Sequence, residues 1–158
     1  LQHVSTAWGV EAIRQAKARG VSVTAEATPH HLTLTDERVD GYDTNAKMNP
    51  PLRSAVDRDA VRAGLADGTL DVYATDHAPH TLEEKSQIYP NSTSGMPAVE
   101  NSLALILNQM LQGRCSLQQV VQWMCEAPAR IWNVENKGRH RPFYDVIALG
   151  CAYPLSTR

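Results

Sequence analysis

Several features are scarce in this 158-residue chain. Its three cysteines, Cys115, Cys125 and Cys151, have the spacing of neither a zinc knuckle nor a disulfide framework, so we expect reduced thiols. No apolar stretch approaches the ~20 residues that a membrane-spanning helix needs. The net charge of −2 gives no reason to expect nucleic acid or a membrane as a partner. We therefore expect a cytoplasmic location.

The chain is also short for one of the large α/β folds. A complete (β/α)8 barrel typically needs ~250 residues, and this chain has 158. The first letters, LQHVST, do not start with Met and show neither the basic nor the apolar region of a signal peptide. We expect the chain to be a piece of a longer protein.

The hydrophobic pattern predicts an α/β fold with a parallel sheet. We expect strands at residues 1–5, 21–27 and 70–75, helices at residues 9–19, 57–66, 97–112, 116–126 and 127–132, and a long loop at residues 28–53. Strands that alternate with helices in this way lie parallel, and their carboxyl ends meet at one edge of the sheet. Ligand-binding residues are therefore expected directly after each strand.

Two sets of apolar residues are expected to pack in the core. The helix at residues 97–112 carries an apolar stripe, which consists of Val99, Leu103, Leu107, Met110 and Leu111. The three tryptophans, Trp8, Trp123 and Trp132, are most simply explained as packing residues.

The strongest chemical signal is the sequence ATDHAPH at residues 74–80. A carboxylate and two imidazoles follow a buried strand at the point where such a sheet opens to substrate. Asp76 could bind a metal ion and carry a proton, and histidine can bind zinc. The alternative is structural, with Asp76 as a helix N-cap and the histidines on the surface.

Histidines also follow the two earlier strands. His3 ends the first strand, although a single histidine is more often structural than a metal ligand. His30 and His31 follow the second strand. Neighbouring residues of an extended segment point to opposite sides, so at most one of this pair is expected to face the site.

Two loop sequences suit contact with a small polar substrate. Asn49, in the sequence KMNPPLR, can both donate and accept hydrogen bonds, which suits an amide or ureido group. The alternative for this segment is a rigid turn. Gly95, in the sequence SGMP, permits close approach of the backbone to a ligand, although this signal is weak by itself.

Taken in order, these segments resemble the bacterial dihydroorotases of the amidohydrolase superfamily. The matching letters are HVST (3–6), VTAEATPHHL (23–32), KMNPPLR (47–53), DGT (67–69), ATDHAPHT (74–81), EEK (83–85) and GMPAVE (95–100). The resemblance covers about residues 1–138 and implies the C-terminal portion of a TIM-like (β/α)8 metal-dependent hydrolase barrel, incomplete in this chain. Residues 139–158 diverge from the family, and we expect this tail to pack poorly.

The resemblance implies a metal site and a reaction. Two zinc ions would be present in the complete enzyme, with His3 and Asp76 among their ligands and Asp76 also as the catalytic acid and base. His30 and His31 are not assigned to the metal. The implied reaction is the reversible interconversion of N-carbamoyl-L-aspartate and L-dihydroorotate in pyrimidine biosynthesis.

The resemblance also implies substrate contacts and partners. The implied substrate-binding residues are Asn49, His80, Ser94 and Gly95. The expected partner is a small molecule, and a homo-oligomer or an association with aspartate carbamoyltransferase is a further expectation. The family's His-x-His pair with its Arg, its bridging carboxylate and another ligand histidine are expected upstream of residue 1. We therefore expect the isolated chain to be inactive.

Two alternative functions stay open. A similar barrel and metal site serve allantoinases and hydantoinases, which hydrolyse other cyclic ureides. A dihydroorotase-like subunit without activity could instead bind a related enzyme, although Asp76, His80 and Asn49 argue against a site that has lost its function.

Overall fold

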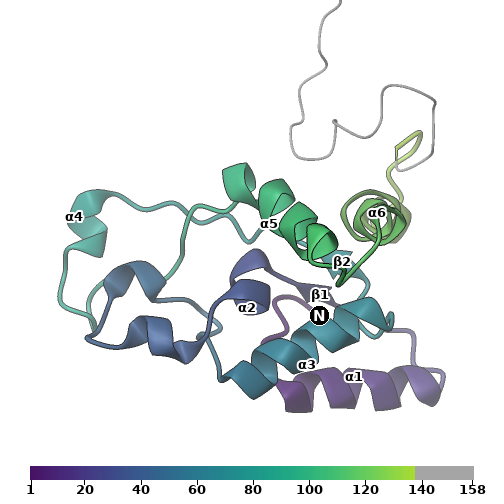
Figure 1. The fold of residues 1–158 in the computed structure, drawn as a ribbon, viewed down its shortest axis with the longest axis horizontal. Helices are drawn as coiled ribbons and strands as arrows, with labels where there is room; N and C mark the ends of the chain where they lie inside the picture. Colours follow the sequence, from purple (N-terminus) through teal and green to yellow (C-terminus); the bar gives the residue numbers. More distant parts are fainter. Residues whose placement is uncertain (138–158) are drawn as a thin grey trace, which may run out of the picture.

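The structure, a computed structural model, describes residues 1–137 and has helices on both sides of a small parallel sheet (Figure 1). The strands β1 (Glu26–Ala27) and β2 (Val72–Tyr73) pair in parallel. Glu26 lies opposite Val72, and Ala27 lies opposite Tyr73. The predicted α/β class is confirmed, whereas the predicted tail at residues 139–158 lies outside the described residues.

No regular strand forms at residues 1–5, where the first strand was predicted, but this segment runs beside β1 and bonds to it. The Val4 amide donates to the Glu26 carbonyl (3.0 Å), and the Glu26 amide donates to the Leu1 carbonyl (3.2 Å). The regular strands are shorter than predicted. One reason is that the Ala25 amide donates to the Asp71 carboxylate (2.9 Å) rather than to a strand carbonyl.

Two helices pack together on one side of the sheet. They are α1 (Ala7–Ala18) and α3 (Ala55–Ala66), close to the predicted bounds. Gly64 lets them approach closely, because a Cβ added there would lie 2.7 Å from a methyl group of Val10. The Asp57 carboxylate of α3 accepts a hydrogen bond from the Ala7 amide (2.9 Å), which ties the helix starts together.

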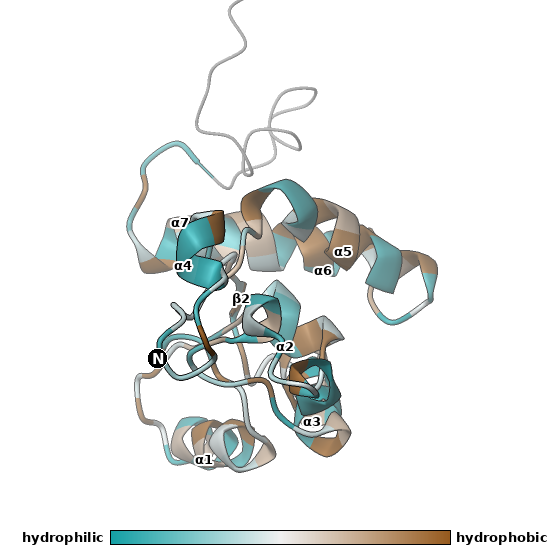
Figure 2. Cartoon of the chain, turned by 90° about the vertical axis from the view of Figure 1, so that its left-hand side faces the viewer, coloured by the Kyte–Doolittle hydropathy of each residue, from teal (hydrophilic) through white to brown (hydrophobic). Residues whose placement is uncertain are grey.

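The predicted C-terminal helices lie on the other side of the sheet. They are α5 (Val99–Leu111), α6 (Leu117–Val121), the π-helical turn η3 (Gln122–Glu126) and α7 (Ala127–Ile131). The predicted capping box at the start of α6 is confirmed, since Ser116 and Gln119 each bond the other's backbone amide. The turn η3 packs on β2. Figure 2 shows hydrophobic and hydrophilic sides on these helices.

The predicted core face of α5 is wrong. The buried residues of this helix are Ser102, Ile106 and Gln109, whereas Val99 and Leu103 of the apolar stripe are each 42% exposed. The helix meets the sheet through its other side, where the buried Tyr73 hydroxyl donates to the Ser102 carbonyl (3.1 Å). The apolar stripe therefore lies on an open surface of the described residues.

A second open apolar surface runs along α1. A groove of about 340 Å³ is lined mainly by Leu1, Val4, Trp8, Ala12, Ala16 and Val23. The side chain of Trp8 is 81% exposed and that of Trp132 is 66% exposed, so the packing predicted for these two is not seen among the described residues. Trp123 is buried, as predicted.

The predicted long loop at residues 28–53 is partly helical. It contains α2 (Pro29–Thr33) and the short 3-10 helices η1 (Asp36–Val39) and η2 (Thr44–Ala46). The polar residues of this segment, which suggested a loop, include residues at the starts of short helices as well as in turns. Thr28 caps α2 by accepting from the His31 amide, and proline is well suited to the first position of a helix.

The molecule divides into two regions. The loop region, residues 34–53 and 78–97, lies to one side of the sheet and contains α4 (Leu82–Lys85), a short helix that was not predicted (Figure 1). Its small core consists of Leu34, Val39, Ala46, Met48, Leu52 and Met96. The sheet region, residues 1–33, 54–77 and 98–137, holds the larger core, which includes Val10, Val61, Leu65, Leu70, Tyr73 and Ile106.

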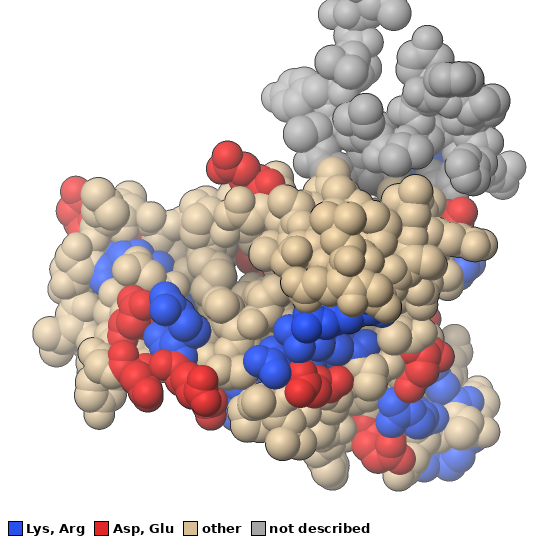
Figure 3. All heavy atoms as spheres, in the orientation of Figure 1, with Lys and Arg blue, Asp and Glu red and all other residues tan. Residues whose placement is uncertain are grey.

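The surface agrees with the small net charge. Basic and acidic side chains lie beside one another on the face shown in Figure 3. None of the helices in residues 1–137 is long and apolar enough to cross a membrane.

Candidate functional site

His3, His30 and Asp76 come together near the carboxyl ends of the three parallel segments. The Nε2 atom of His3 lies 3.4 Å from Asp76 Oδ1, and the Nε2 atom of His30 lies 3.6 Å from Asp76 Oδ2. The predicted neighbours His3 and Asp76 are therefore adjacent in space. His30, which sequence reasoning left unassigned, joins them.

The backbone at two of these residues is strained. His3 has a φ of 53° and Asp76 a φ of 47°, in the left-handed region that few residues other than glycine adopt. Such strain costs about 1–3 kcal/mol and clusters at active sites. No helix begins at Asp76, since the next one, α4, is capped by Thr81. The structure therefore excludes the N-cap alternative for Asp76.

Glu26 lies behind His3. Its Oε1 atom is 2.8 Å from the Nδ1 atom of His3, and both side chains are mostly buried. The two atoms are within ion-pair distance, although the contact does not have the geometry of a hydrogen bond. A carboxylate in this position orients a metal-binding histidine and fixes which ring nitrogen carries the proton.

His30 is buried in a neutral state. Its residue exposure is 2%, and burial, with smaller effects of His31 and His3, lowers the pKa of His30 to about 3. Neither ring nitrogen has a hydrogen-bond partner among the described residues. An unpartnered buried polar group costs about 1–3 kcal/mol. A neutral imidazole whose Nε2 faces a carboxylate has the chemistry of a metal ligand.

His31 has a different task from its neighbour. Its Nδ1 atom accepts from the Thr28 hydroxyl (2.7 Å), and its Nε2–H donates to the Pro50 carbonyl (3.0 Å). We infer this tautomer from the two partners, since a carbonyl only accepts. Burial lowers the pKa of His31, which favours the neutral ring. His31 thus ties the turn that carries Asn49 to the end of β1.

The two histidines of α2 were expected in an extended segment, and that expectation is wrong. They lie in a helix, so both rings are buried and their centroids are 4.4 Å apart. One histidine of the pair nevertheless faces Asp76, as predicted. The local signal that separates them is Thr28-Pro29, which starts the helix and sets the direction of each ring.

His77 has a structural partner. Its Nδ1 atom accepts hydrogen bonds from the amides of Ala98 (2.9 Å) and Val99 (3.2 Å) and so caps the start of α5. The structural alternative that sequence reasoning gave for this histidine is therefore favoured.

The predicted substrate residues in the loop region lie close to one another. The Nε2–H of His80 donates to the Ser94 carbonyl (2.9 Å), and its Nδ1 lies 3.3 Å from Glu84. Gly95 is buried with a φ of 128°, and a Cβ added there would lie 2.7 Å from that of Ala78. This position requires glycine because the backbone is both strained and crowded.

Asn49 is exposed at the edge of this group. Its side chain makes no hydrogen bond to any residue within 1–137, so the amide can bind a ligand. Two residues before it, the Lys47 carbonyl accepts from the Gly95 amide (2.9 Å). The structure therefore links the Asn49 turn to the Ser94-Gly95 segment.

The cluster fits zinc in the chemistry of its side chains and falls short in their arrangement. One carboxylate and two imidazoles are donors that zinc binds, and the Nε2 atoms of His3 and His30 both face Asp76. Among residues 1–137, however, no group of three His, Cys, Asp or Glu side chains is arranged closely enough to hold a metal ion. The described residues thus offer part of a coordination sphere.

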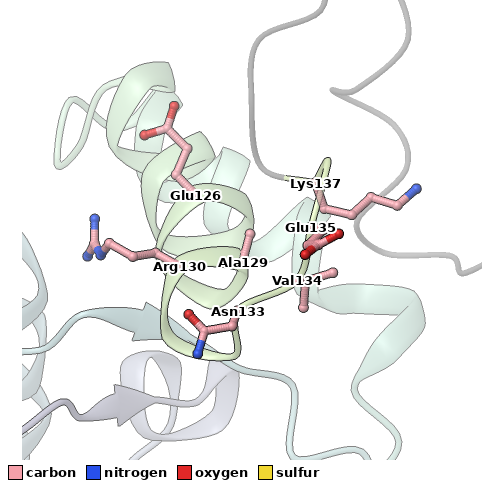
Figure 4. Close-up of a pocket in the computed structure, with 7 residues that line it drawn as sticks. All are labelled: Glu126, Ala129, Arg130, Asn133, Val134, Glu135 and Lys137. Carbon is pink, nitrogen blue, oxygen red and sulfur yellow. The ribbon is translucent and has the colours of Figure 1, made fainter.

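A pocket of about 470 Å³ lies elsewhere, at the end of α7 (Figure 4). Its lining consists of Glu126, Ala129, Arg130, Asn133, Val134, Glu135 and Lys137. It shares no residue with the histidine and aspartate cluster, and we assign it no part in the site.

Known proteins resemble the chain in sequence. The dihydroorotase of Citrifermentans bemidjiense is 52% identical over 135 residues, which are 85% of this chain and 32% of the relative. The dihydroorotase of Pelotomaculum thermopropionicum is 53% identical over 146 residues, which are 92% of this chain and 34% of the relative. The chain therefore spans about a third of the length of these relatives.

Solved structures resemble the fold. An L-hydantoinase (dihydropyrimidinase) from Arthrobacter aurescens matches with a TM-score of 0.83 and 32% identity, over 92% of this chain and 33% of its own. A dihydroorotase from Saccharomyces cerevisiae, solved with 5-fluoroorotic acid, matches with a TM-score of 0.74 over 86% of this chain and 38% of its own. At 22% identity, the latter likeness shows the fold alone. Residues 2–145 match the amidohydrolase family, and the chain belongs to that family.

Proposed function

We propose that this chain is part of a dihydroorotase, which interconverts N-carbamoyl-L-aspartate and L-dihydroorotate. The observation that carries the proposal is the cluster of His3, His30 and Asp76 at the strand ends. The relatives that are about half identical over most of the chain supply the substrate class.

The chain would work within a larger barrel. It spans about a third of the relatives' length, and the apolar groove along α1 is a surface that further strand and helix units would cover. Residues 1–138 would then be the C-terminal part of a (β/α)8 barrel. We expect the isolated chain to be inactive, because it offers only part of a metal site.

His3 and Asp76 would be zinc ligands, and the rest of the barrel would supply the others. Zinc would polarise the amide carbonyl of the substrate and lower the pKa of water toward ~7, which supplies a nucleophile near neutral pH. Burial keeps His30 neutral, and Glu26 favours one orientation of His3. Glu26 would therefore prepare the His3 imidazole to bind the ion.

Asp76 would move the proton of the reaction. Its two carboxylate oxygens face His3 and His30, and its side chain is 21% exposed, so substrate can reach it. The carboxylate would accept a proton from the attacking water and deliver it to the ring nitrogen as the amide bond breaks. The strained backbone of Asp76 would keep the carboxylate at this place.

The loop region would bind the substrate. The Asn49 amide suits the ring amide, and the backbone at Ser94 and Gly95 can approach the ring closely. His80 uses both ring nitrogens for Ser94 and Glu84, so we expect it to act at least partly by holding Ser94 in place. A cytoplasmic location, oligomerisation and association with aspartate carbamoyltransferase stay predictions.

A hydantoinase-type activity is the second candidate, because solved hydantoinases share the fold at TM-scores up to 0.83. The identity is 32% to the Arthrobacter aurescens enzyme and 52% to the Citrifermentans bemidjiense dihydroorotase, which favours dihydroorotate. A non-catalytic subunit is disfavoured, since His3 and Asp76 keep a strained and convergent geometry.

A chimera tests the proposal. Residues 1–137 would replace the matching segment of the Citrifermentans bemidjiense dihydroorotase, and zinc content and hydrolysis of dihydroorotate, hydantoin and allantoin would be measured. We expect bound zinc and a clear preference for dihydroorotate, with no turnover by the isolated chain. A folded chimera that binds zinc but prefers hydantoin or allantoin would contradict the substrate assignment.

A further inference from the structure

We propose that Lys47 and Lys85 are positioning residues that hold the substrate-binding segment, residues 89–96, against the turn that carries Asn49. The inference rests on the proposed function for its catalytic consequence. Its structural part rests on hydrogen bonds from the two ammonium groups to backbone carbonyls of the loop region.

Lys47 holds several carbonyls with one side chain. Its Nζ atom donates to the carbonyls of Ser92 (2.6 Å), Tyr89 (2.7 Å) and, at a longer distance, Pro90 (3.3 Å). The ammonium also lies 5.2 Å from the centre of the Tyr89 ring. Several charge-assisted hydrogen bonds from one ammonium group fix the backbone path of an irregular segment, because they are directional and apolar packing is not.

Lys85 makes the same kind of contact with the next part of the segment. Its Nζ atom donates to the carbonyls of Thr44 and Thr93, each at 3.0 Å, and the Thr44 hydroxyl donates back to the Lys85 carbonyl. The residue is 9% exposed, and burial, followed by the charge of Lys47, lowers the pKa of Lys85. The two lysines therefore act on adjacent parts of one segment.

Neither ammonium forms a salt bridge within residues 1–137. Carbonyl oxygens take the place that a carboxylate usually fills beside a buried charge. A methionine could pack at either position, but the carbonyls of Tyr89, Ser92 and Thr93 would then lose these donors. The hydrogen bonds to these carbonyls therefore explain why a lysine occupies each of the two positions.

The backbone of Lys47 connects this arrangement to the site. Its carbonyl accepts from the Gly95 amide (2.9 Å), and Asn49 follows two residues later. On the other side of Gly95, the Met96 carbonyl accepts from the Ala78 amide (3.1 Å), close to Asp76. Lys47 thus joins the Asn49 turn to the Ser94-Gly95 segment, which Met96 in turn links to the loop that follows Asp76.

Amide hydrogen exchange on the 158-residue chain tests the structural part. We expect Lys47→Met and Lys85→Met to speed exchange in residues 89–96 about tenfold or more, since local opening becomes easier. Exchange in the core of α3 should stay unchanged. Lys17→Met is the matched control, because Lys17 bonds Asp71 and Gly68 in the sheet region. Unchanged exchange in residues 89–96, or an equal rise along the whole chain, would overturn the proposal.

Steady-state kinetics of the chimera test the catalytic part. Lys47→Met should raise KM for dihydroorotate about tenfold, with zinc content unchanged and a smaller change in kcat, because substrate contacts are displaced while the reacting groups stay in place. Lys85→Met repeats the test should Lys47→Met not fold. An unchanged KM, or a fall in kcat together with zinc content, would contradict a positioning role. Absence of turnover in the unsubstituted chimera would refute the proposed function instead, and hydrogen exchange alone would then decide the role of the lysines.

Discussion

The sheet region and the loop region are stabilised by different physical means. The sheet region has a continuous apolar core in which Val61 and Leu70 are fully buried. The loop region buries few apolar residues and relies on Lys47 and Lys85, which donate to backbone carbonyls. Hydrophobic burial is non-directional and stabilises a whole domain, whereas hydrogen bonds from a lysine fix particular atoms of an irregular segment.

The proposed roles of the site residues also differ between the sheet region and the loop region. The cluster proposed for metal binding and proton transfer, which consists of His3, His30 and Asp76, lies near strand ends in the sheet region. The groups proposed to bind substrate, such as Asn49 and Ser94, lie in the loop region. Binding residues on loops that a rigid scaffold positions are common in enzymes. The comparison predicts that changes in one region should alter chemistry and changes in the other should alter substrate binding.

The largest effect is expected at Asp76. In the chimera, Asp76→Asn should lower kcat about 10²–10⁴-fold, because the amide cannot carry the proton. The loop region should be unaffected, so hydrogen exchange in residues 89–96 should match that of the parent. A variant that keeps more than a tenth of the parent kcat would contradict the role of Asp76.

The next effect concerns the two cores. Leu70→Ala should lower the free energy of unfolding by about 2–5 kcal/mol, because it opens a cavity in a fully buried site. Met48→Ala, in the small core of the loop region, should act mainly on local exchange there. Urea unfolding and hydrogen exchange measure both. Equal global destabilisation by the two variants would show that the regions unfold as one unit.

A smaller effect is expected at Gly95. Alanine there should cost about 1–3 kcal/mol of local stability, since the backbone has a φ of 128° and the added Cβ would meet Ala78. Gly68→Ala is the matched control, because Gly68 also has a positive φ but faces open space. In the chimera, Gly95→Ala should raise KM while Gly68→Ala should not. Similar kinetics for both variants would refute the close packing at Gly95.

The smallest expected effect is a loss of stability at alkaline pH, caused by Tyr73 in the sheet region. Burial raises the pKa of Tyr73 above its ordinary value near 10, and its hydroxyl donates to the Ser102 carbonyl. The unfolded chain therefore releases this proton first, and stability should fall as pH rises above about 10. Tyr73→Phe should lower the free energy of unfolding by about 1 kcal/mol at pH 7. Its free energy of unfolding should also depend less on pH between pH 9 and 11. Equal pH dependence in both proteins would contradict this account.

The sequence predicts the order of helices and strands well because local patterns determine it. The alternation at residues 21–27, the apolar run at residues 70–75 and the cap at Ser116 are signals that neighbouring residues carry. The face of α5 was not predictable in this way. Its apolar stripe is exposed while Ser102 and Gln109 are buried, since the contact with Tyr73 depends on the tertiary arrangement.

The candidate site shows the same limit. His3 and Asp76 could be placed together because parallel strands end at one edge. His30 could not be separated from His31 without knowledge that α2 is a helix. The lysines gave no signal, since the carbonyls they bind are backbone atoms, which every sequence has.

The zinc content of two variants of the chimera, His3→Asn and His31→Asn, tests the central claim most directly. The Nε2 atom of His3 lies 3.4 Å from Asp76, whereas both ring nitrogens of His31 are occupied by Thr28 and Pro50. We predict that His3→Asn loses bound zinc and that His31→Asn keeps it. Zinc retained in full by a folded His3→Asn variant, or lost only from His31→Asn, would contradict the proposed site.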